Sequence, residues 1–253
     1  MPTIGSDVVA RLRAAGCVFA EDEARLLIEA AAAPSELDTL VERRAAGTPL
    51  EHVLRWADFC DLRIVLDEGV FVPRRRSELL AREAIALARP DAVVLDLCCG
   101  SGAVGAAIAA AVDGEVHAAD IDPAAVRCAR RNLPTAHLSV GDLFDPLPAS
   151  LRRRVDVLVA NAPYVPTDAI ALLPTEARDH ETRIALDGGA DGLDVQRRVI
   201  AEAPRWLSPA GHLLVETSQG QAFGTMAAFE RSGLRARVVR DEDLDATVVI
   251  GRR

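Results

Sequence analysis

The sequence predicts an α/β protein whose main domain is a seven-stranded, mostly parallel β-sheet covered by helices on both faces. After about residue 77, short apolar segments alternate with helix-forming segments. The apolar segments lack the alternation of a half-exposed strand, which is typical of parallel strands buried on both faces. The predicted strands are 92–97, 115–120, 137–140, 155–160, 212–217, 235–240 and 246–252. Only about five residues separate the last two, too few for a parallel crossover, so one strand must run antiparallel.

Helix signals fill the gaps between the first strands. Ser77 can cap a helix that runs to Arg89, and residues 102–112 are a run of small helix formers. Pro123 stands at the first turn of a helix that ends at Asn132. Such alternation of strand and helix gives a Rossmann-like arrangement, so residues 77–253 are predicted to form one domain.

The N-terminal part is predicted to be organised differently. Residues 1–50 contain three short helices by apolar spacing and are expected to form a small helical domain that recognises the substrate. Residues 51–76 are expected to be a linker built on a β-hairpin, with strands at 58–66 and 69–72 on either side of a two-residue turn.

Composition excludes several classes of protein. The net charge of -9 repels a phosphate backbone, so free nucleic acid is not expected as a substrate. The five cysteines include no C-x2-C pair and the five histidines show no ligand spacing, so neither a disulfide framework nor a metal site is implied. No segment reaches the roughly 18 apolar residues of a membrane helix. The expected location is the cytoplasm, away from membranes.

A candidate cofactor site lies at the end of the first strand, in LDLCCGSG (95–102). Glycines there allow a ligand to approach the backbone, and the following helix offers free N–H groups. Asp96 would repel a pyrophosphate but could meet a positive ligand group. Asp120, at the end of the second strand, suits a ribose diol, and Asp142, after the third, suits an adenine amino group.

An acidic pocket with ribose and adenine contacts favours S-adenosylmethionine, whose sulfonium and ammonium groups are cationic. Transfer of its methyl group would leave S-adenosylhomocysteine. No metal is required. The candidate cofactor-binding residues are Asp96, Cys98, Gly100, Gly102, Asp120, Ile121, Asp142, Leu143 and Asn161.

A polar and aromatic cluster follows the fourth strand, in VDVLVANAPY (155–164). The lone pair of a planar amino nitrogen is delocalised, so two carbonyl acceptors that hold its N–H groups would turn the lone pair toward the methyl donor. Asn161 offers a side-chain carbonyl and Ala162 a backbone carbonyl. Pro163 stiffens the chain, and Tyr164 offers a flat face. These four residues are the candidate catalytic group.

The chain as a whole resembles the HemK/PrmC family of protein-(glutamine-N5) methyltransferases. These are class I S-adenosylmethionine-dependent enzymes that modify the glutamine of the Gly-Gly-Gln motif in peptide chain release factors. The segments that carry the resemblance, besides LDLCCGSG and NAPY, are TPLEHVL (48–54), VPRRRSE (72–78), ALDGGADGL (185–193) and ETSQGQ (216–221). The family has P-L-x-Y-I, I-P-R-P-E-T-E, A-L-x-G-G-x-D-G-L and E-I-G-x-x-Q at these places.

The resemblance implies a fold, a reaction and a partner. It implies the class I methyltransferase fold, and methyl transfer to the side-chain amide nitrogen of a protein glutamine, with a release factor as the partner. Residues 161–164 stand where the family has N-P-P-Y. Gly100, Gly102, Asp120 and Asp142 stand in its donor-binding positions.

Three departures indicate a divergent member. Ala162 replaces the first proline of N-P-P-Y, which keeps the carbonyl but removes the ring that fixes φ. Cys98 and Cys99 replace the usual small residues of the glycine turn and are expected to be packed thiols. RWADFCDL (55–62) lacks the aromatic-glycine pattern that the family has before its hairpin.

Three other functions remain open at this point. A nucleic-acid adenine N6 methyltransferase would act on the same kind of nitrogen, but it needs a basic surface to hold the backbone. A small-molecule amide or amine could be the acceptor. A protein that binds the donor without catalysis is the third alternative, and Ala162 suggests it.

Overall fold

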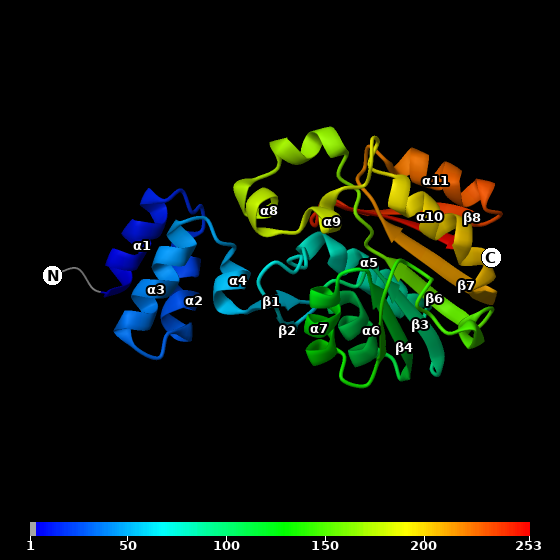
Figure 1. Cartoon of the computed structure of the whole chain (residues 1–253), viewed down its shortest axis with the longest axis horizontal. Coiled ribbons are helices and arrows are strands. Elements are labelled where there is room, and N and C mark those ends of the chain that lie inside the picture. The colour runs from blue at the N-terminus through cyan, green and yellow to red at the C-terminus, as the bar shows by residue number, and fades with distance from the viewer. Residues whose placement is uncertain (1–3) are drawn as a thin grey trace.

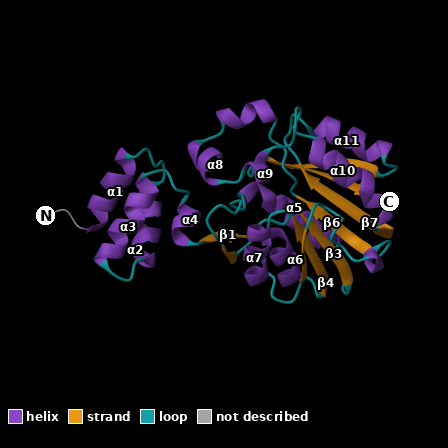
Figure 2. Cartoon of the chain, in the orientation of Figure 1, coloured by secondary structure: helices purple, strands orange, loops and turns teal. Residues whose placement is uncertain are grey.

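The computed structural model describes residues 4–253, in which a small helical unit stands beside a larger α/β unit (Figure 1). In the larger unit one central sheet lies between layers of helices (Figure 2), and a separate two-stranded hairpin stands on the side of the helical unit. The first three residues of the predicted N-terminal domain lie outside the described residues. Within the described part, no helix combines the length and the apolar character that a membrane crossing requires.

The elements have the following bounds. The helices are α1 (Ile4–Ala14), α2 (Ala20–Ala30), α3 (Pro34–Ala45), α4 (Leu50–Leu54), α5 (Glu78–Leu87), α6 (Ala103–Ala111), α7 (Pro123–Asn132), α8 (Thr175–His180), α9 (Arg183–Leu186), α10 (Asp194–Glu202) and α11 (Ala222–Arg231). The strands are β1 (Trp56–Phe59), β2 (Leu62–Val65), β3 (Ala92–Leu97), β4 (Gly114–Asp120), β5 (His137–Val140), β6 (Val155–Ala160), β7 (Leu207–Glu216), β8 (Arg235–Asp241) and β9 (Ala246–Arg252). The 3-10 turns within residues 4–253 are η1 (Arg75–Ser77), η2 (Ala149–Leu151), η3 (Thr167–Leu172) and η4 (Ala203–Arg205).

The larger sheet has seven strands in the order β5-β4-β3-β6-β7-β9-β8. β9 runs antiparallel to both of its neighbours, and the remaining pairs are parallel. The predicted sheet with one antiparallel strand is therefore confirmed. From β3 the chain builds outward through β4 and β5, and then it returns to place β6 on the other side of β3. Ligands of open α/β sheets bind at the carboxyl ends of the strands beside such a reversal.

Alternate side chains of β3 enter two different cores, which explains why its sequence shows no polar alternation. Val94 belongs to the core that also holds Leu80 of α5 and Ile108 of α6. Leu95 belongs to the opposite core, with Phe229 of α11. The helical unit has a separate core formed by α1 to α4.

A hairpin is present, but the predicted positions of its strands are wrong. The strands are β1 and β2, and the turn is at Cys60 and Asp61, with φ of 48° and 60°. Two successive residues at positive φ form the tight turn whose twist matches a hairpin, and glycine or asparagine usually marks it. Cys-Asp does not give that signal, so residues 58–66 look like one strand. Residues 69–72 form no strand; Val70 and Val72 pack into a small core beside α7.

Ser77 precedes α5 as predicted, but its side chain does not cap the helix. Its hydroxyl instead faces the segment after β6, where it takes part in the site described next.

Candidate active site

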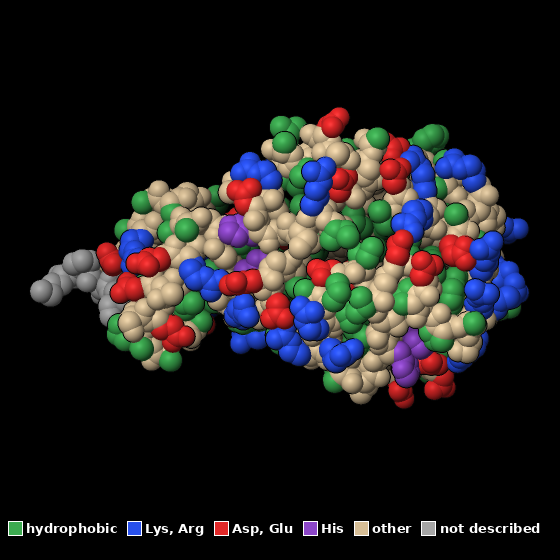
Figure 3. Space-filling view, viewed as in Figure 1, with side chains coloured by type: hydrophobic (Ala, Val, Ile, Leu, Met, Phe, Trp, Pro, Cys, Tyr) green, Lys and Arg blue, Asp and Glu red, His purple; other side chains and the backbone are tan. Residues whose placement is uncertain are grey.

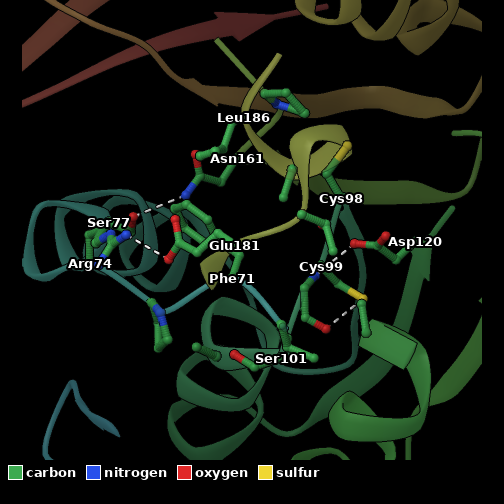
Figure 4. Close-up of a pocket in the computed structure, with 18 of the residues that line it drawn as sticks. Phe71, Arg74, Ser77, Cys98, Cys99, Ser101, Asp120, Asn161, Glu181 and Leu186 are labelled. Carbon is green, nitrogen blue, oxygen red and sulfur yellow. Dashed lines mark hydrogen bonds and ion pairs between the residues drawn. The ribbon is translucent and has the colours of Figure 1, made fainter. Parts of the chain in front are cut away.

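A cavity of about 350 Å³ opens at the carboxyl ends of β3, β4 and β6. It is lined by the turn after β3, the end of β4, the segment after β6, the residues that lead into α5, and the segment that carries α8 and α9. Figure 4 shows side chains from these segments facing one another, with Asn161 on one side and the turn of Cys98 and Cys99 on the other. The volume lies in the range of small-molecule sites, which is about 300–1,000 Å³.

The glycine turn after β3 is closed on one side and open on the other. A Cβ atom at Gly102 would lie 2.9 Å from Leu133 Cδ1, so this glycine lets the turn pack against the end of α7. At Gly100, which lines the cavity, a Cβ would meet nothing within 4 Å. Both glycines have positive φ, of 78° and 54°. The turn therefore leaves room at Gly100 for a ligand to approach its backbone.

Asp96 is a buried carboxylate at the end of β3. Its Oδ2 accepts a hydrogen bond from the backbone N–H of Gly105 at 3.0 Å, and Asp96 as a whole is 2% exposed. Burial raises the pKa of Asp96 to about 7, and the nearby charge of Asp120 adds to the rise. A carboxylate in this state gains most from a cationic neighbour.

Asp120 ends β4 and is tied to two turns. Its Oδ2 accepts a hydrogen bond from Gly100 N–H and its Oδ1 accepts one from Asp122 N–H, both at 2.9 Å. Burial raises the pKa of Asp120, while these backbone hydrogen bonds oppose the rise. The exposed Ile121 follows it at the mouth of the cavity. Asp96, Cys98, Gly100, Asp120, Ile121 and Asn161 of the predicted set all line this cavity.

Asp142 and Leu143 lie outside the cavity lining. Asp142 Oδ2 forms an ion pair with Arg198 Nη2 at 2.6 Å. Leu143 is 9% exposed and packs in the core that contains Leu95. Arg198 is paired with only one oxygen of this carboxylate, whose other oxygen can still accept a hydrogen bond, and the predicted contact of Asp142 with adenine remains a prediction.

The segment after β6 carries the candidate catalytic group. Asn161 Nδ2 donates a hydrogen bond to Ser77 Oγ at 3.0 Å. Tyr164 O–H donates to Glu216 Oε1 at 3.2 Å, and its backbone carbonyl accepts a hydrogen bond from Gln221 Nε2. All four residues of the group line the cavity.

Two charged residues beside this group were not predicted from the sequence. Arg76 Nε lies 3.5 Å from Glu216 Oε1, and its guanidinium lies 5.8 Å from the centroid of the Tyr164 ring. Arg76 Nε and Glu216 Oε2 are buried and have no hydrogen-bond partner within residues 4–253. Both residues fall in segments that carry the family resemblance, but no spacing in the sequence brings the segments together.

Residues 167–187, here called the cover segment, contain η3, α8 and α9 and close one side of the cavity. Glu181 in this segment is buried and accepts hydrogen bonds from the backbone N–H of Val72 at 3.0 Å and from Arg74 Nη2 at 2.6 Å. Glu176 of α8 forms an ion pair with Arg44 of α3 at 2.6 Å. The cover segment thus contacts both the entry to α5 and the helical unit, between which it lies in Figure 1.

The paired cysteines of the glycine turn are packed thiols. Burial raises the pKa of Cys98 and that of Cys99 well above their ordinary value, and the charges of Asp96 and Asp120 raise both further. Both thiols therefore stay protonated near neutral pH and are poor nucleophiles.

One further group of ionisable side chains lies on β4 and β5. The ligand atoms of Glu115, His117 and His137 are within 4.8 Å of one another, because the β4–β5 register pairs the two histidines. The imidazole rings are stacked, with centroids 4.7 Å apart, and Glu115 is also paired with Arg154 at 3.0 Å. The positive charge of Arg154 beside this carboxylate would repel a metal cation, so we assign no metal to this group.

The face in Figure 3 carries small groups of arginine at its right-hand edge and in its lower centre, and elsewhere side chains of both charges are mixed. This mixture of charges agrees with the acidic composition and does not favour the backbone of a nucleic acid as a ligand.

Known proteins resemble this chain in sequence and in structure. A family model described as a methyltransferase domain matches residues 94–180. The release factor glutamine methyltransferase of Geobacter sulfurreducens is 39% identical over 199 residues, which are 77% of this chain and 69% of that protein. The one from Mycolicibacterium smegmatis is 38% identical over 81% of this chain and 74% of its own. The ribosomal protein uL3 glutamine methyltransferase of Burkholderia pseudomallei is 37% identical over 77% and 69%.

Solved structures show the same fold at lower identity. A chain of the Mtq2–Trm112 complex of E. cuniculi, described as responsible for methylation of the eRF1 translation termination factor, has a TM-score of 0.54 at 21% identity and covers 73% of this chain and 99% of its own. A methyltransferase from Pyrococcus furiosus has a TM-score of 0.52 at 17% identity, with coverage of 68% and 81%. The fold is that of class I methyltransferases. Given the extended identity with the glutamine methyltransferases, the chain belongs to the HemK/PrmC family of protein-(glutamine-N5) methyltransferases.

Proposed function

We propose that this methyltransferase moves a methyl group from S-adenosylmethionine to the side-chain amide nitrogen of a glutamine in a peptide chain release factor. The observation that carries the proposal is one cavity in which an acidic glycine turn and an Asn-Ala-Pro-Tyr segment meet at the ends of neighbouring strands. The sequence relatives named for release factor glutamine methylation support this choice of acceptor.

The residues around the glycine turn fit the proposed donor. The open side of Gly100 would admit the donor to the backbone. Asp96 and Asp120 accept hydrogen bonds from backbone N–H groups, and no arginine of residues 4–253 forms an ion pair with either of them. Asp120 would accept from the ribose hydroxyls, and Asp96 would face the cationic end. When bound there, S-adenosylmethionine supplies an electrophilic methyl group on a sulfonium.

The residues after β6 fit a carboxamide acceptor. With Nδ2 of Asn161 engaged by Ser77, its Oδ1 is the atom left to accept a hydrogen bond from a substrate N–H. The carbonyl of Ala162 would accept the second N–H. Together they would fix the nitrogen, turn its lone pair outward and stabilise the positive charge that develops on it. The face of Tyr164 would pack against the planar amide.

We propose that residues 1–50 help to recognise the protein substrate and that the hairpin region, residues 51–76, joins this unit to the catalytic unit. The helical unit has its own core, and its Arg44 reaches Glu176 in the cover segment beside the cavity. This contact beside the cavity supports a role of the helical unit in holding a protein whose glutamine side chain would enter the cavity.

The test is a methylation assay with labelled S-adenosylmethionine and four separate acceptors: a release factor with its Gly-Gly-Gln motif, ribosomal protein uL3, total RNA and duplex DNA. The expected result is label in the release factor that disappears when the motif glutamine is changed to glutamate. Label in uL3 alone would support the second candidate, which the relative from Burkholderia pseudomallei favours. Label in nucleic acid alone, or donor binding with no labelled acceptor, would overturn the proposal.

A further inference from the structure

The side-chain amide of Asn161 can lie in two orientations that differ by a flip about one bond. In one, its carbonyl oxygen faces the substrate, and in the other its NH₂ group does. Because a substrate carboxamide also presents an NH₂ group, the second orientation sets donor against donor. The proposed function therefore needs something that holds the first orientation.

Ser77 Oγ is the partner of this amide inside the protein. It lies 3.0 Å from Asn161 Nδ2, and Figure 4 shows this bond joining the entry of α5 to the segment after β6. A serine hydroxyl can both donate and accept, so by itself it would bind either end of the amide. The direction of the bond depends on where the hydroxyl hydrogen goes. Ser77 is 1% exposed, so water does not compete for that hydrogen.

Glu216, at the end of β7, lies beside the turn that carries Ser77, because Arg76 Nε, one residue before Ser77, is 3.5 Å from Glu216 Oε1. The guanidinium favours the ionised form of this carboxyl. Burial raises its pKa, and the Ser77 hydroxyl, the Arg76 guanidinium and the Tyr164 hydroxyl oppose the rise. Tyr164 O–H donates to Oε1, and Oε2 is buried with no hydrogen-bond partner within residues 4–253. An ionised carboxylate can only accept, so every hydroxyl beside it is drawn to donate.

We propose that Ser77 and Glu216 are positioning residues that fix the amide orientation of Asn161. The carboxylate of Glu216 takes the hydrogen of Ser77, so the oxygen of Ser77 must accept from Asn161 Nδ2. The carbonyl oxygen of Asn161 is then directed to the substrate. This inference rests on the proposed function, because it assigns the polarity of the group that would bind the amide.

The decisive variants change hydrogen-bond polarity with little change of shape. In Glu216→Gln, the new NH₂ group donates to Ser77, which then donates to the carbonyl of Asn161 and favours the flipped amide. We expect kcat on the release factor to fall about 100-fold, the scale of losing one preorganised polar contact, with little change in the Kd of S-adenosylmethionine. Ser77→Ala removes the preference for one orientation of the Asn161 amide without favouring the other, so we expect kcat to fall only about 10-fold. Ser77→Thr keeps the hydroxyl and should retain most activity.

The double variant distinguishes polarity from ordinary damage. Without Ser77, the reversed donor of Glu216→Gln cannot reach Asn161, so Ser77→Ala with Glu216→Gln should be more active than Glu216→Gln alone. Losses that multiply in the double variant would overturn the proposal. If Glu216→Gln does not fold, the comparison of Ser77→Ala with Ser77→Thr still decides, because equal losses in these two would contradict a role for the hydroxyl.

A readout without substrate separates this inference from the proposed function. The side-chain NH₂ of Asn161, followed by NMR in the ¹⁵N-labelled free protein, should exchange with solvent slowly in the wild type and faster in Ser77→Ala. Unchanged exchange would overturn the inference even if the enzyme methylates glutamine. If exchange is slow but the protein methylates no glutamine, the positioning of Asn161 by Ser77 and Glu216 would be supported and the proposed function would be wrong.

Discussion

The backbone N–H of Gly105, in the first turn of α6, donates a hydrogen bond to the carboxylate of Asp96 at 3.0 Å. This single bond is the main compensation for a side chain that is otherwise desolvated, and burial leaves its pKa at about 7. Such a carboxylate is unfavourable in an empty site and favourable beside a cation. Asp96 is therefore a place where ligand binding and stability oppose each other.

We expect Asp96→Asn to stabilise the ligand-free protein at pH 8 and to weaken donor binding. In the folded protein the pKa of Asp96 is about 7, whereas in the unfolded chain it is near 3.9. Between pH 3.9 and pH 7 the folded state therefore binds more protons than the unfolded state, and the free energy of unfolding falls as the pH rises. At pH 8 the variant should gain up to about 4 kcal/mol in the free energy of unfolding, and at pH 5 the gain should shrink.

Urea unfolding at pH 5 and pH 8, with titration calorimetry for S-adenosylmethionine, checks this. The Kd should rise at least about tenfold in the variant. An equal change in stability at both pH values would mean that the carboxylate is not the source of the effect.

The glycine turn can be tested with a matched pair of substitutions. Gly102 and Gly233 have similar φ values, 78° and 75°, but a Cβ at Gly102 meets Leu133 at 2.9 Å and one at Gly233 meets nothing within 4 Å. Both alanine variants bear the strain of positive φ, about 1–2 kcal/mol. Only Gly102→Ala must also shift the turn, so only it should weaken donor binding by more than about tenfold. Similar Kd values in the two variants would show that the turn tolerates the shift.

The main sheet and the two halves of the cavity could be predicted because their signals are local. Buried strands show continuous apolar runs, and the polar residues at their ends stand next to them in the sequence. The hairpin was misplaced because Cys60 and Asp61 adopt positive φ without the residues that usually announce it. Asp142 was expected at the cavity, but its partner Arg198 lies 56 positions away and no spacing reveals the pair.

The same limit applies to the residues that support the site. Ser77 lies 84 positions from Asn161, and Tyr164 lies 52 positions from Glu216. Only the packing of α5 and β7 against β6 brings these side chains together. A sequence alone shows Ser77 as a possible helix cap, which is the commoner use of serine before a helix.

Proline at position 162 should improve the acceptor half of the site. Ala162 is 1% exposed, and the loop hydrogen bonds of residues 4–253 include none from its N–H, so a proline removes none of them. The ring would fix φ at 162 and restrict Asn161 to extended backbone. We expect Ala162→Pro to raise kcat several-fold with unchanged Kd for the donor, and to change the free energy of unfolding by about 1 kcal/mol or less. A fall in kcat would show that the site has been shaped around alanine.

The ion pair between Arg44 and Glu176 should control the cover segment more than the stability of the protein. Glu176 has a side chain that is 45% exposed, so losing the pair should change the free energy of unfolding by less than about 1 kcal/mol. Arg44 keeps its buried partner Glu23 at 2.6 Å in Glu176→Gln, so the helical unit retains its core. What is lost is the charge contact that joins α8 to α3.

We therefore expect Glu176→Gln to speed hydrogen exchange in residues 174–182 and to raise the KM for the release factor, with little effect on kcat. Glu29→Gln is the matched control, because Glu29 pairs with Arg25 at 3.4 Å within a single helix, and the substitution removes the same charge. The control should change neither quantity. Equal effects of the two variants would assign the change to net charge. Unchanged exchange in Glu176→Gln would show that other contacts, such as the partly buried ion pair of Glu181 with Arg74, hold the cover segment in place.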